Sequence, residues 1–468
     1  RYDRDAPTHG VPTAELALLE TFYDRGAEAV QVLVDAGGLY LNRERGHIFP
    51  DYHADLPQNA APIGRSFGPA MPPEQELAAG QAVNANLPGG TILIEVLRQA
   101  AKARGVKLLL GHRVVHVHQD DDGAVVGVEV HAGRGRGTVL VGARRGVVFA
   151  SGGFLHDEQL ARDFLRGPLL GGCASSGSTG DFIRIGIEAG AQLGNMQQAW
   201  WTQTVLDVVL RARETAEDIW FPFGDSMIQV DKYGRRVMDE KQTYNDRGPV
   251  HFAWDAGRRE YPNLVLFQIY DDAVAQKESP EGFRGYIPFP GQPAPYVISG
   301  TTFAELAANI DSRLVELQAE TGGVRLAADF TETLTRSVER FSEFARQGVD
   351  RDFGRGDKPI QQSWQLWQGT PRGGVPNPCL APFADHGPYH CILLVAAALD
   401  TKGGPRIDPS SRVLGTDGQP IAGLYGAGNC IASPAGAGYW GAGGTIGPAV
   451  VFGVIAGQHA ARQQDRIQ

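Results

Sequence analysis

The sequence predicts an α/β protein, in which a Rossmann-like, doubly wound domain is interrupted by an inserted α+β domain. Short apolar segments that end in glycines occupy both ends of the chain, and the middle is richer in aromatic and charged residues. A glycine-rich loop leads into an apolar helix near residue 445. We therefore expect residues 1–205 and 376–468 to form one domain and residues 206–375 to form the inserted domain.

Composition narrows the class of protein. A chain of 468 residues with 42% hydrophobic content predicts a well-packed protein of enzyme size. The net charge of −10 is spread along the chain, which argues against a nucleic-acid partner. No apolar run reaches the roughly 20 residues of a membrane span, and no signal segment opens the chain. The four cysteines form no CxxC pair, so we expect structural thiols, no metal site and a cytoplasmic location. They are Cys173, Cys379, Cys391 and Cys430.

The first part of the chain reads as a helix followed by several strands. Apolar residues at helical spacing predict a helix from Thr91 to Gly105, and the apolar run 107–110 then predicts a strand. Residues 113–143 alternate in a way that is typical of an antiparallel meander. A buried strand at 146–150 then ends at Ser151, Gly152 and Gly153, which become candidates for cofactor contact, although this tripeptide alone also fits a simple turn.

The inserted segment and the end of the chain carry further signals. Residues 303–320 and 333–348 have the pattern of amphipathic helices. In the loop 436–444, Tyr439 and Trp440 project from a floor of Gly and Ala on which a flat ligand can lie. Thr445 can cap the following helix, whose first turn tolerates Pro448 and whose positive end attracts an anionic group such as a cofactor ring.

Taken in order, the motifs VVFASGGF, STGDFIRIGIEAGAQLGNM, KYGRRVMDEKQTY, LDTKGGPRID, GLYGAGN and GYWGAGGTIGP resemble those of the flavoproteins related to fumarate reductase, over nearly the whole chain. Among these, the 3-ketosteroid Δ1-dehydrogenases are the most similar. The resemblance implies an FAD-binding domain with a catalytic cap and FAD as the cofactor. It also implies that the following residues contact the cofactor: Ser151, Gly152, Gly153, Gly180, Asp181, Gly428, Asn429, Gly444, Thr445 and Ile446.

The same resemblance implies a catalytic group of three tyrosines and a glycine. The Tyr439 hydroxyl and the Gly443 amide match the pair that binds the substrate ketone oxygen, Tyr244 matches the base that takes the neighbouring proton, and Tyr52 matches its assistant. The reaction would be the introduction of a C=C bond beside a ketone, with the hydride passing to flavin and then to an electron acceptor. Each tyrosine also has a structural interpretation, since a buried tyrosine usually packs its ring and satisfies its hydroxyl on the backbone.

Other motif residues have structural interpretations as well. Gly428 and Asn429 can form a turn, Asp181 can cap a helix, and Arg235 and Arg236 are typical of a solvated hairpin end.

Departures from the family leave alternatives open. The histidine and arginine that bind dicarboxylates in fumarate reductases are absent, and Trp440 replaces a proline of the steroid enzymes, so a smaller ketone such as 4-oxocyclohexanecarboxylate is an alternative substrate. Ene reduction is the nearest rival reaction. Residues 1–41 contain no GxGxxG phosphate loop. We expect a truncated record; a second chain, a different mode of holding flavin, or a non-catalytic substrate-binding remnant are the alternatives.

Overall fold

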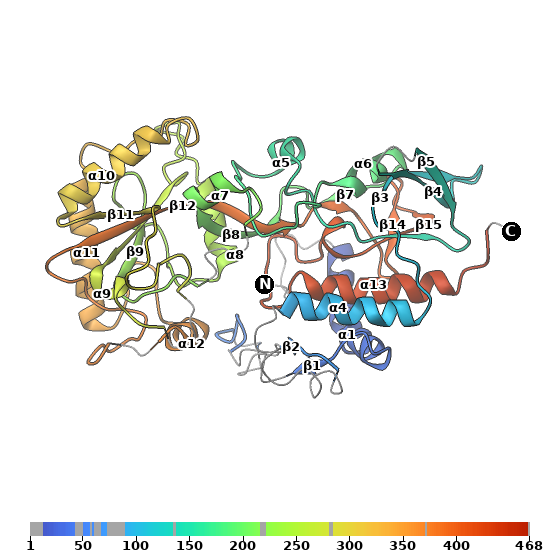
Figure 1. Ribbon diagram of the computed structural model, residues 1–468, viewed down its shortest axis with the longest axis horizontal. Coiled ribbons are helices and arrows are strands. Elements are labelled where there is room, and N and C mark those ends of the chain that lie inside the picture. Colours follow the sequence, from blue (N-terminus) through green and yellow to red (C-terminus); the bar gives the residue numbers. More distant parts are fainter. Residues whose placement is uncertain are drawn as a thin grey trace.

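The molecule is elongated, with the inserted segment at one end and the two outer segments of the chain at the other (Figure 1). This computed structural model describes residues 13–42, 50–56, 59, 67–72, 89–133, 137–215, 221–279, 284–369 and 372–466. Within these residues no helix has the length and apolar content needed to cross a membrane. The cysteines Cys173, Cys379, Cys391 and Cys430 are free thiols, and the last three are buried.

Helices from both ends of the chain pack together in the outer half. Helix α1 (Thr13–Asp35) lies along α13 (Ile446–Ala461), with α4 (Gly89–Ala103) beside them (Figure 1). The helix expected from Thr91 is therefore confirmed. Leu18 and Ala29 of α1 share a core with Val451 and Phe452 of α13. The apolar helix at the end of the chain is thus buried on one side, partly by α1, while Ile446, Ala449 and Gly457 stay exposed.

The predicted meander is also confirmed. Strand β3 (His112–Gln119) pairs antiparallel with β4 (Val125–Ala132), which pairs antiparallel with β5 (Thr138–Gly142). Strand β6 (Val147–Phe149) pairs parallel with β15 (Pro420–Gly426), which pairs antiparallel with β14 (Arg412–Leu414). Segments far apart in the sequence thus form one sheet.

Two expectations for this half are wrong. Residues 106–109 have no regular structure, and Leu108, Leu109 and Leu110 are 65%, 58% and 78% exposed. None of the described residues pairs with this run, and an apolar run without a partner has no ladder to join. Strand β6 is only partly buried, because Val148 is 42% exposed.

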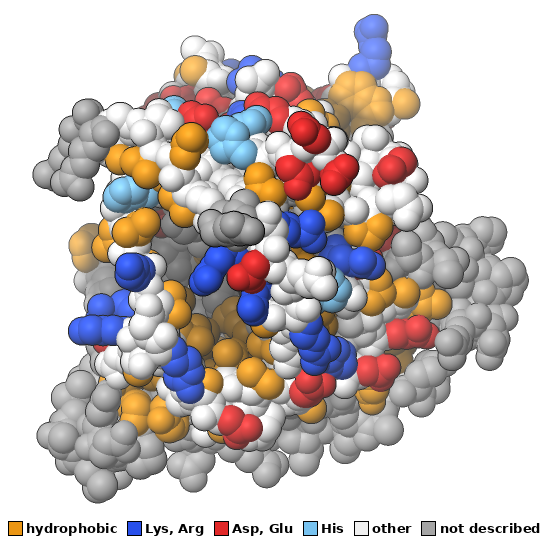
Figure 2. All heavy atoms as spheres, turned by 90° about the vertical axis from the view of Figure 1, so that its right-hand side faces the viewer, with side chains coloured by type: hydrophobic (Ala, Val, Ile, Leu, Met, Phe, Trp, Pro, Cys, Tyr) orange, Lys and Arg blue, Asp and Glu red, His pale blue; other side chains and the backbone are white. Residues whose placement is uncertain are grey.

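The outer end of the molecule combines apolar and basic side chains. Figure 2 shows Lys and Arg side chains around a hollow that has hydrophobic side chains on its floor. Positive charge around an apolar hollow favours an anionic ligand that also has an apolar part.

A five-stranded antiparallel sheet forms the body of the inserted half. Its path is β11–β12–β10–β9, and β8 also pairs with β12. The strands are β8 (Ala199–Val205), β9 (Met227–Val230), β10 (Leu266–Asp271), β11 (Val297–Gly300) and β12 (Tyr389–Thr401). Helices α10 (Phe303–Glu316) and α11 (Phe330–Gln347) pack on it, as their periodicity predicted, and bury a shared core that includes Leu306, Ile310, Leu334 and Val338.

Strand β12 connects the two halves. Residues 389–394 pair with β10 and residues 394–401 pair with β8, so one strand runs from the inserted sheet toward the outer half (Figure 1). The expected domain boundary between residues 375 and 376 stays a prediction. The remaining described elements are β1 (Leu41–Asn42), β2 (Gly68–Pro69), α5 (Glu158–Phe164), α6 (Asp181–Glu188), β7 (Leu193–Gly194), α7 (Leu206–Arg211), α8 (Tyr244–Arg247), α9 (Asp272–Ala275), α12 (Pro359–Trp367), β13 (Gly404–Pro405) and the 3₁₀ segments Gly248–Phe252 and Gly428–Cys430.

Candidate active site

Three tyrosines from distant parts of the chain meet in one buried cluster. Tyr52 lies in the segment 50–56, Tyr244 is the first residue of α8, and Tyr439 lies in the loop before α13. They are 8%, 5% and 9% exposed and pack with Trp200 and Trp364. The structure therefore brings the three predicted tyrosines together, and their catalytic roles stay a prediction.

The hydroxyl groups of this tyrosine cluster are within hydrogen-bonding reach of one another. The Tyr244 and Tyr439 oxygens are 2.5 Å apart, and the ring centroids of these two residues are 5.2 Å apart. The ring of Tyr52 stands edge-on to both, at centroid distances of 6.3 Å from Tyr244 and 5.9 Å from Tyr439. A substrate oxygen that binds one of these hydroxyls lies next to the other.

Burial keeps these phenols protonated. It raises the pKa of Tyr52 to about 12, and it also raises the pKa of Tyr439 and strongly raises that of Tyr244. A phenol acts as a base only as its anion, so Tyr244 needs a positive charge nearby to give up its proton near neutral pH.

Glycines allow the Tyr439 loop to pack against the rings. A Cβ at Gly444 would lie 2.5 Å from Cε2 of Tyr439, and a Cβ at Gly441 would lie 3.0 Å from the Tyr52 ring. Gly443 differs, because it is exposed, has a φ of +82° and has nothing within 4 Å of an added Cβ. The loop is thus packed on its tyrosine side and open at Gly443, where a ligand can approach the backbone.

Three side chains hold the carbonyls of this loop in place. The Tyr439 carbonyl is 2.7 Å from Nε2 of His53, and Lys402 Nζ donates to the Gly438 carbonyl at 2.8 Å. Asn245 Nδ2 donates to the carbonyl of residue 437 at 3.4 Å. We did not predict these contacts from the sequence. Lys402 lies in the TKGG motif, which was the one available signal.

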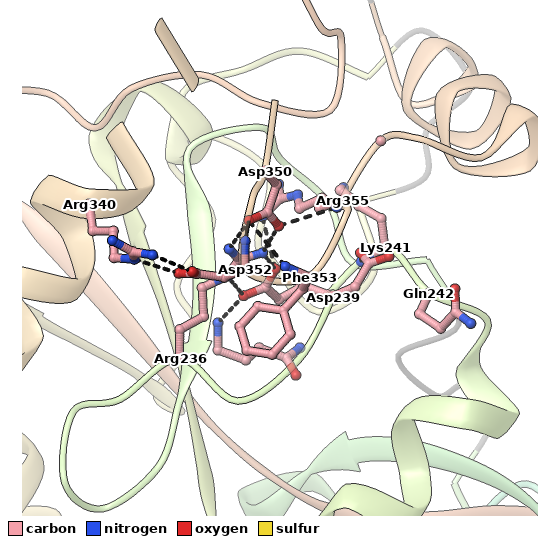
Figure 3. Close-up of polar contacts among 12 residues, drawn as sticks. Arg236, Asp239, Lys241, Gln242, Arg340, Asp350, Asp352, Phe353 and Arg355 are labelled. Atoms are coloured by element: carbon pink, nitrogen blue, oxygen red, sulfur yellow. Dashed lines mark hydrogen bonds and ion pairs between the residues drawn. The ribbon is translucent and has the colours of Figure 1, made fainter. Parts of the chain in front are cut away.

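A buried ion-pair network fixes the segment that precedes Tyr244. Arg236 bonds both oxygens of Asp350 at 2.9 and 2.7 Å and both oxygens of Glu240 at 2.8 Å (Figure 3). The Arg236 side chain is 5% exposed, so the expected solvated hairpin end is wrong for this residue. Arg235 matches the expectation better, since it is 49% exposed and pairs with Asp231.

The candidate cofactor residues gather around a buried carboxylate. Asp400 accepts hydrogen bonds from the Gly153 amide at 2.9 Å and from Asn429 Nδ2 at 3.1 Å. These two donors follow β6 and β15, whose carboxyl ends meet because the strands are parallel. Burial raises the pKa of Asp400. The structure thus brings the turns 151–153 and 428–429 together through a residue that we did not predict.

The other candidate cofactor residues are divided between two helix starts. Gly180 is the N-cap residue of α6 with a φ of +70°, and the next residue, Asp181, pairs with Arg113 at 2.5 Å. Gly444 donates its amide to the Gly441 carbonyl at 3.0 Å. Their cofactor contacts stay predictions.

The capping expectation for Thr445 is wrong. Thr445 stands at the N-cap position of α13, but its φ of −93° and ψ of −46° are helical and its side chain makes no capping bond. An N-cap side chain needs an extended backbone to reach the third helical amide. In the first turn of α13 the Gly447 amide donates to the Gly443 carbonyl at 2.6 Å and Pro448 has no N–H. A donor that a ligand can use is therefore the amide of Ile446, which is 51% exposed.

A protein family described as "FAD binding domain" matches residues 5–446. The chain belongs to this family. The expected α/β fold and FAD as cofactor are thereby confirmed. The residues present fit FAD, because exposed backbone at Ser151 and Gly443 and the uncapped start of α13 suit a flat anionic ring system.

Individual members of the FAD-binding family are similar over most of the chain. The 4-oxocyclohexanecarboxylate 2-dehydrogenase of Sinomonas cyclohexanicum is 33% identical over 382 residues, which cover 80% of this chain and 61% of that protein. The 3-oxosteroid 1-dehydrogenase of Mycobacterium tuberculosis is 33% identical over 402 residues, which cover 82% and 65%. The chain thus spans less than two thirds of the length of these relatives.

A solved structure shares the fold. The 3-ketosteroid delta1-dehydrogenase of Sterolibacterium denitrificans, in complex with 1,4-androstadiene-3,17-dione, superposes with a TM-score of 0.75 at 24% identity. The match covers 96% of this chain and 86% of that one.

Proposed function

We propose that this protein is an FAD-dependent oxidoreductase that introduces a carbon–carbon double bond next to the ketone of a cyclic substrate. The observation that carries the proposal is the contact of 2.5 Å between the Tyr244 and Tyr439 hydroxyls. Four residues after Tyr439, the backbone of the same loop is open at Gly443. The family membership and the two dehydrogenases that are 33% identical to the chain support it.

The ketone oxygen binds between a hydroxyl and an amide. The Tyr439 hydroxyl donates one hydrogen bond and the Gly443 N–H donates the second. The Tyr439 donor is fixed before the substrate arrives, because the carbonyls of residues 437–439 are held by Asn245, Lys402 and His53. Fixed donors stabilise the negative charge that develops on the oxygen as a proton leaves the α carbon, and one such donor contributes about 3 kcal/mol.

Tyr244 takes that α proton. Its oxygen is 2.5 Å from the Tyr439 oxygen that holds the ketone, so it lies beside the carbon next to the carbonyl. Tyr52 packs edge-on against Tyr244 and assists it as a second phenol. The aromatic side chains of the cluster exclude water from this site. Bound FAD would supply the acceptor for the hydride that leaves the β carbon.

The substrate class is a cyclic ketone, and the size of the ring system is open to test. Trp440 stacks on Phe22 at a centroid distance of 5.0 Å and stands edge-on to Trp200 at 6.2 Å. This aromatic wall lies next to Tyr439. It favours a single-ring ketone such as 4-oxocyclohexanecarboxylate over a steroid, because a bulky indole replaces a small residue beside the ketone site.

In the decisive experiment, the FAD-loaded protein is mixed with a cyclic ketone under anaerobic conditions. We expect the flavin absorbance to bleach with 4-oxocyclohexanecarboxylate or with a 3-ketosteroid, and turnover to follow when an artificial electron acceptor is added. Fumarate with a reduced dye as donor serves as the comparison. Bleaching by neither ketone would overturn the proposal, and rapid oxidation of the dye by fumarate would favour ene reduction instead.

A further inference from the structure

A lysine is buried next to the tyrosine cluster. Lys402 follows β12 directly and is fully buried. Its ammonium group donates to the Gly438 carbonyl at 2.8 Å and to Asn245 Oδ1 at 3.3 Å, and lies 4.2 Å from the centroid of the Trp200 ring. Within the part of the chain that the structure describes, no carboxylate forms an ion pair with it. A cation held by neutral groups alone is costly to bury.

The two partners of this ammonium group are the chain neighbours of the two tyrosines in contact. Asn245 follows Tyr244 in α8, and Gly438 precedes Tyr439 in the loop. Asn245 also donates to the carbonyl of residue 437 at 3.4 Å. The lysine and the asparagine therefore tie the segments that carry the two phenols to each other.

The face of Trp200 that Lys402 occupies is itself fixed. Trp200 Nε1 donates to Asn429 Oδ1 at 3.0 Å, and Asn429 Nδ2 donates to Asp400 at 3.1 Å. The position of the ammonium group is thus set by the candidate cofactor turn on one side and by the Tyr439 loop on the other.

We propose that Lys402 is a positioning residue that holds Tyr439 beside Tyr244 by fixing the residues next to both tyrosines in the chain. The inference rests on the proposed function. Tyr244 is buried and needs a positive charge to form its anion. The buried Arg247 guanidinium of the same helix interacts electrostatically with Tyr244, whereas Lys402 acts through its bonds to Asn245 and Gly438. It touches no reacting atom and acts through the two phenols.

Few other charges face Lys402. The Asp246 carboxylate of α8 raises the pKa of Lys402 and the Arg166 guanidinium lowers it. His53 contacts the same loop at the Tyr439 carbonyl. Asp246 accepts a hydrogen bond from Thr243. Burial lowers the pKa of Lys402 to about 7, so both protonation states are populated near neutral pH, and either of them can donate the bonds to Gly438 and Asn245.

The test compares Lys402→Met, Lys402→Gln and Lys402→Arg with Lys232→Met, a half-buried lysine that pairs with Glu260 outside this cluster. The first readout is the exchange of the α protons of 4-oxocyclohexanecarboxylate in D₂O, followed by NMR across pH. We expect Lys402→Met and Lys402→Gln to exchange at least about tenfold more slowly, because the two hydroxyls are no longer held together. Lys402→Arg should restore most of the rate, and Lys232→Met should match the wild type.

The second readout needs no substrate. The near-ultraviolet difference absorbance of tyrosinate is recorded during a pH titration, and the contribution of Tyr244 is isolated by subtracting the titration of Tyr244→Phe. This contribution should move to lower pH in Lys402→Met and not in Lys402→Arg, because the hydrogen bond to Tyr439 raises the pKa of Tyr244 and is loosened only in the first variant. Coincident titrations of wild type and Lys402→Met, or no Tyr244 contribution in either, would overturn the inference. A wild type that exchanges no ketone proton overturns the proposed function alone, because the titration still decides the role of Lys402.

Discussion

For single side chains, burial and chemistry make opposite demands in the tyrosine cluster. The aromatic surroundings exclude water and strengthen each hydrogen bond, but they also raise the pKa of every phenol. A buried phenol at a contact of 2.5 Å to another is a good donor to a ketone and a poor base without help. We propose Tyr439 as the donor because Gly443 lies four residues on in its loop, and Tyr244 as the base because the buried Arg247 guanidinium of α8 acts on it.

Removing one hydroxyl tests this division. Tyr439→Phe should lower kcat on a cyclic ketone by about 10²- to 10³-fold, because one fixed donor to the developing oxyanion is lost. Steady-state kinetics with an artificial electron acceptor measures the effect. Tyr425→Phe is the matched control, since Tyr425 is a buried tyrosine whose hydroxyl bonds His459 at 2.9 Å, away from the cluster. Equal kcat values for Tyr439→Phe and the control would contradict the role.

For helices and strands, the backbone of the Tyr439 loop decides where the hydroxyl lies. Gly444→Ala should displace the Tyr439 ring, because the new Cβ would lie 2.5 Å from Cε2. We expect a loss of activity of about tenfold or more with little change in the pH profile. Gly457→Ala in α13 is the control: nothing lies within 4 Å of its Cβ, so it should stabilise the protein by up to about 1 kcal/mol. Full activity in Gly444→Ala would show that the loop can relax.

The ion-pair network before α8 makes a second prediction for elements. Arg236→Ala leaves Glu240 and Asp350 buried without this partner and should lower the free energy of unfolding by about 3 to 5 kcal/mol. Arg235→Ala, at a residue 49% exposed, should lower it by less than about 1 kcal/mol. Urea unfolding of both variants measures the difference. Similar losses in the two variants would mean that the network is not what holds this segment.

Local sequence patterns predicted several of the helices and the meander. The features that they did not predict depend on contacts between residues far apart in the sequence. The spacing of apolar residues was enough for α4, α10 and α11, because each helix buries one face. The run 107–110 failed because a strand depends on a partner elsewhere in the chain. Family motifs located the tyrosines. Asp400, Lys402 and the burial of Arg236 escaped prediction because their partners lie up to 247 positions away in the sequence.

For the whole molecule, the buried lysine makes stability depend on pH. Burial lowers the pKa of Lys402 from an ordinary 10.5 to about 7. Between these values the unfolded chain binds a proton that the folded chain lacks, so the contribution of Lys402 to the free energy of unfolding rises with pH, by at most about 1.4 kcal/mol per unit. Below about pH 7 and above about pH 10.5, the contribution of Lys402 does not change with pH.

Urea unfolding at a series of pH values measures this contribution. The difference in free energy of unfolding, wild type minus Lys402→Met, should increase from about pH 7 toward pH 10.5, because groups common to both proteins cancel. Lys232→Met should show no such slope. Parallel curves for wild type and Lys402→Met would mean that Lys402 keeps an ordinary proton affinity in the folded protein.

The course of β12 has a mechanical consequence. This strand of 13 residues begins in the sheet of the inserted half and ends at Asp400 and Thr401, immediately before Lys402. A hydrogen-bonded strand hardly stretches, so a swing of the inserted half about the rest of the molecule would tilt β12 up to Ala398, where its pairing with β8 becomes irregular, and would pull on the carboxylate and the ammonium group just beyond. Admission of a substrate between the halves and the seating of the flavin would then be coupled along one stretch of backbone.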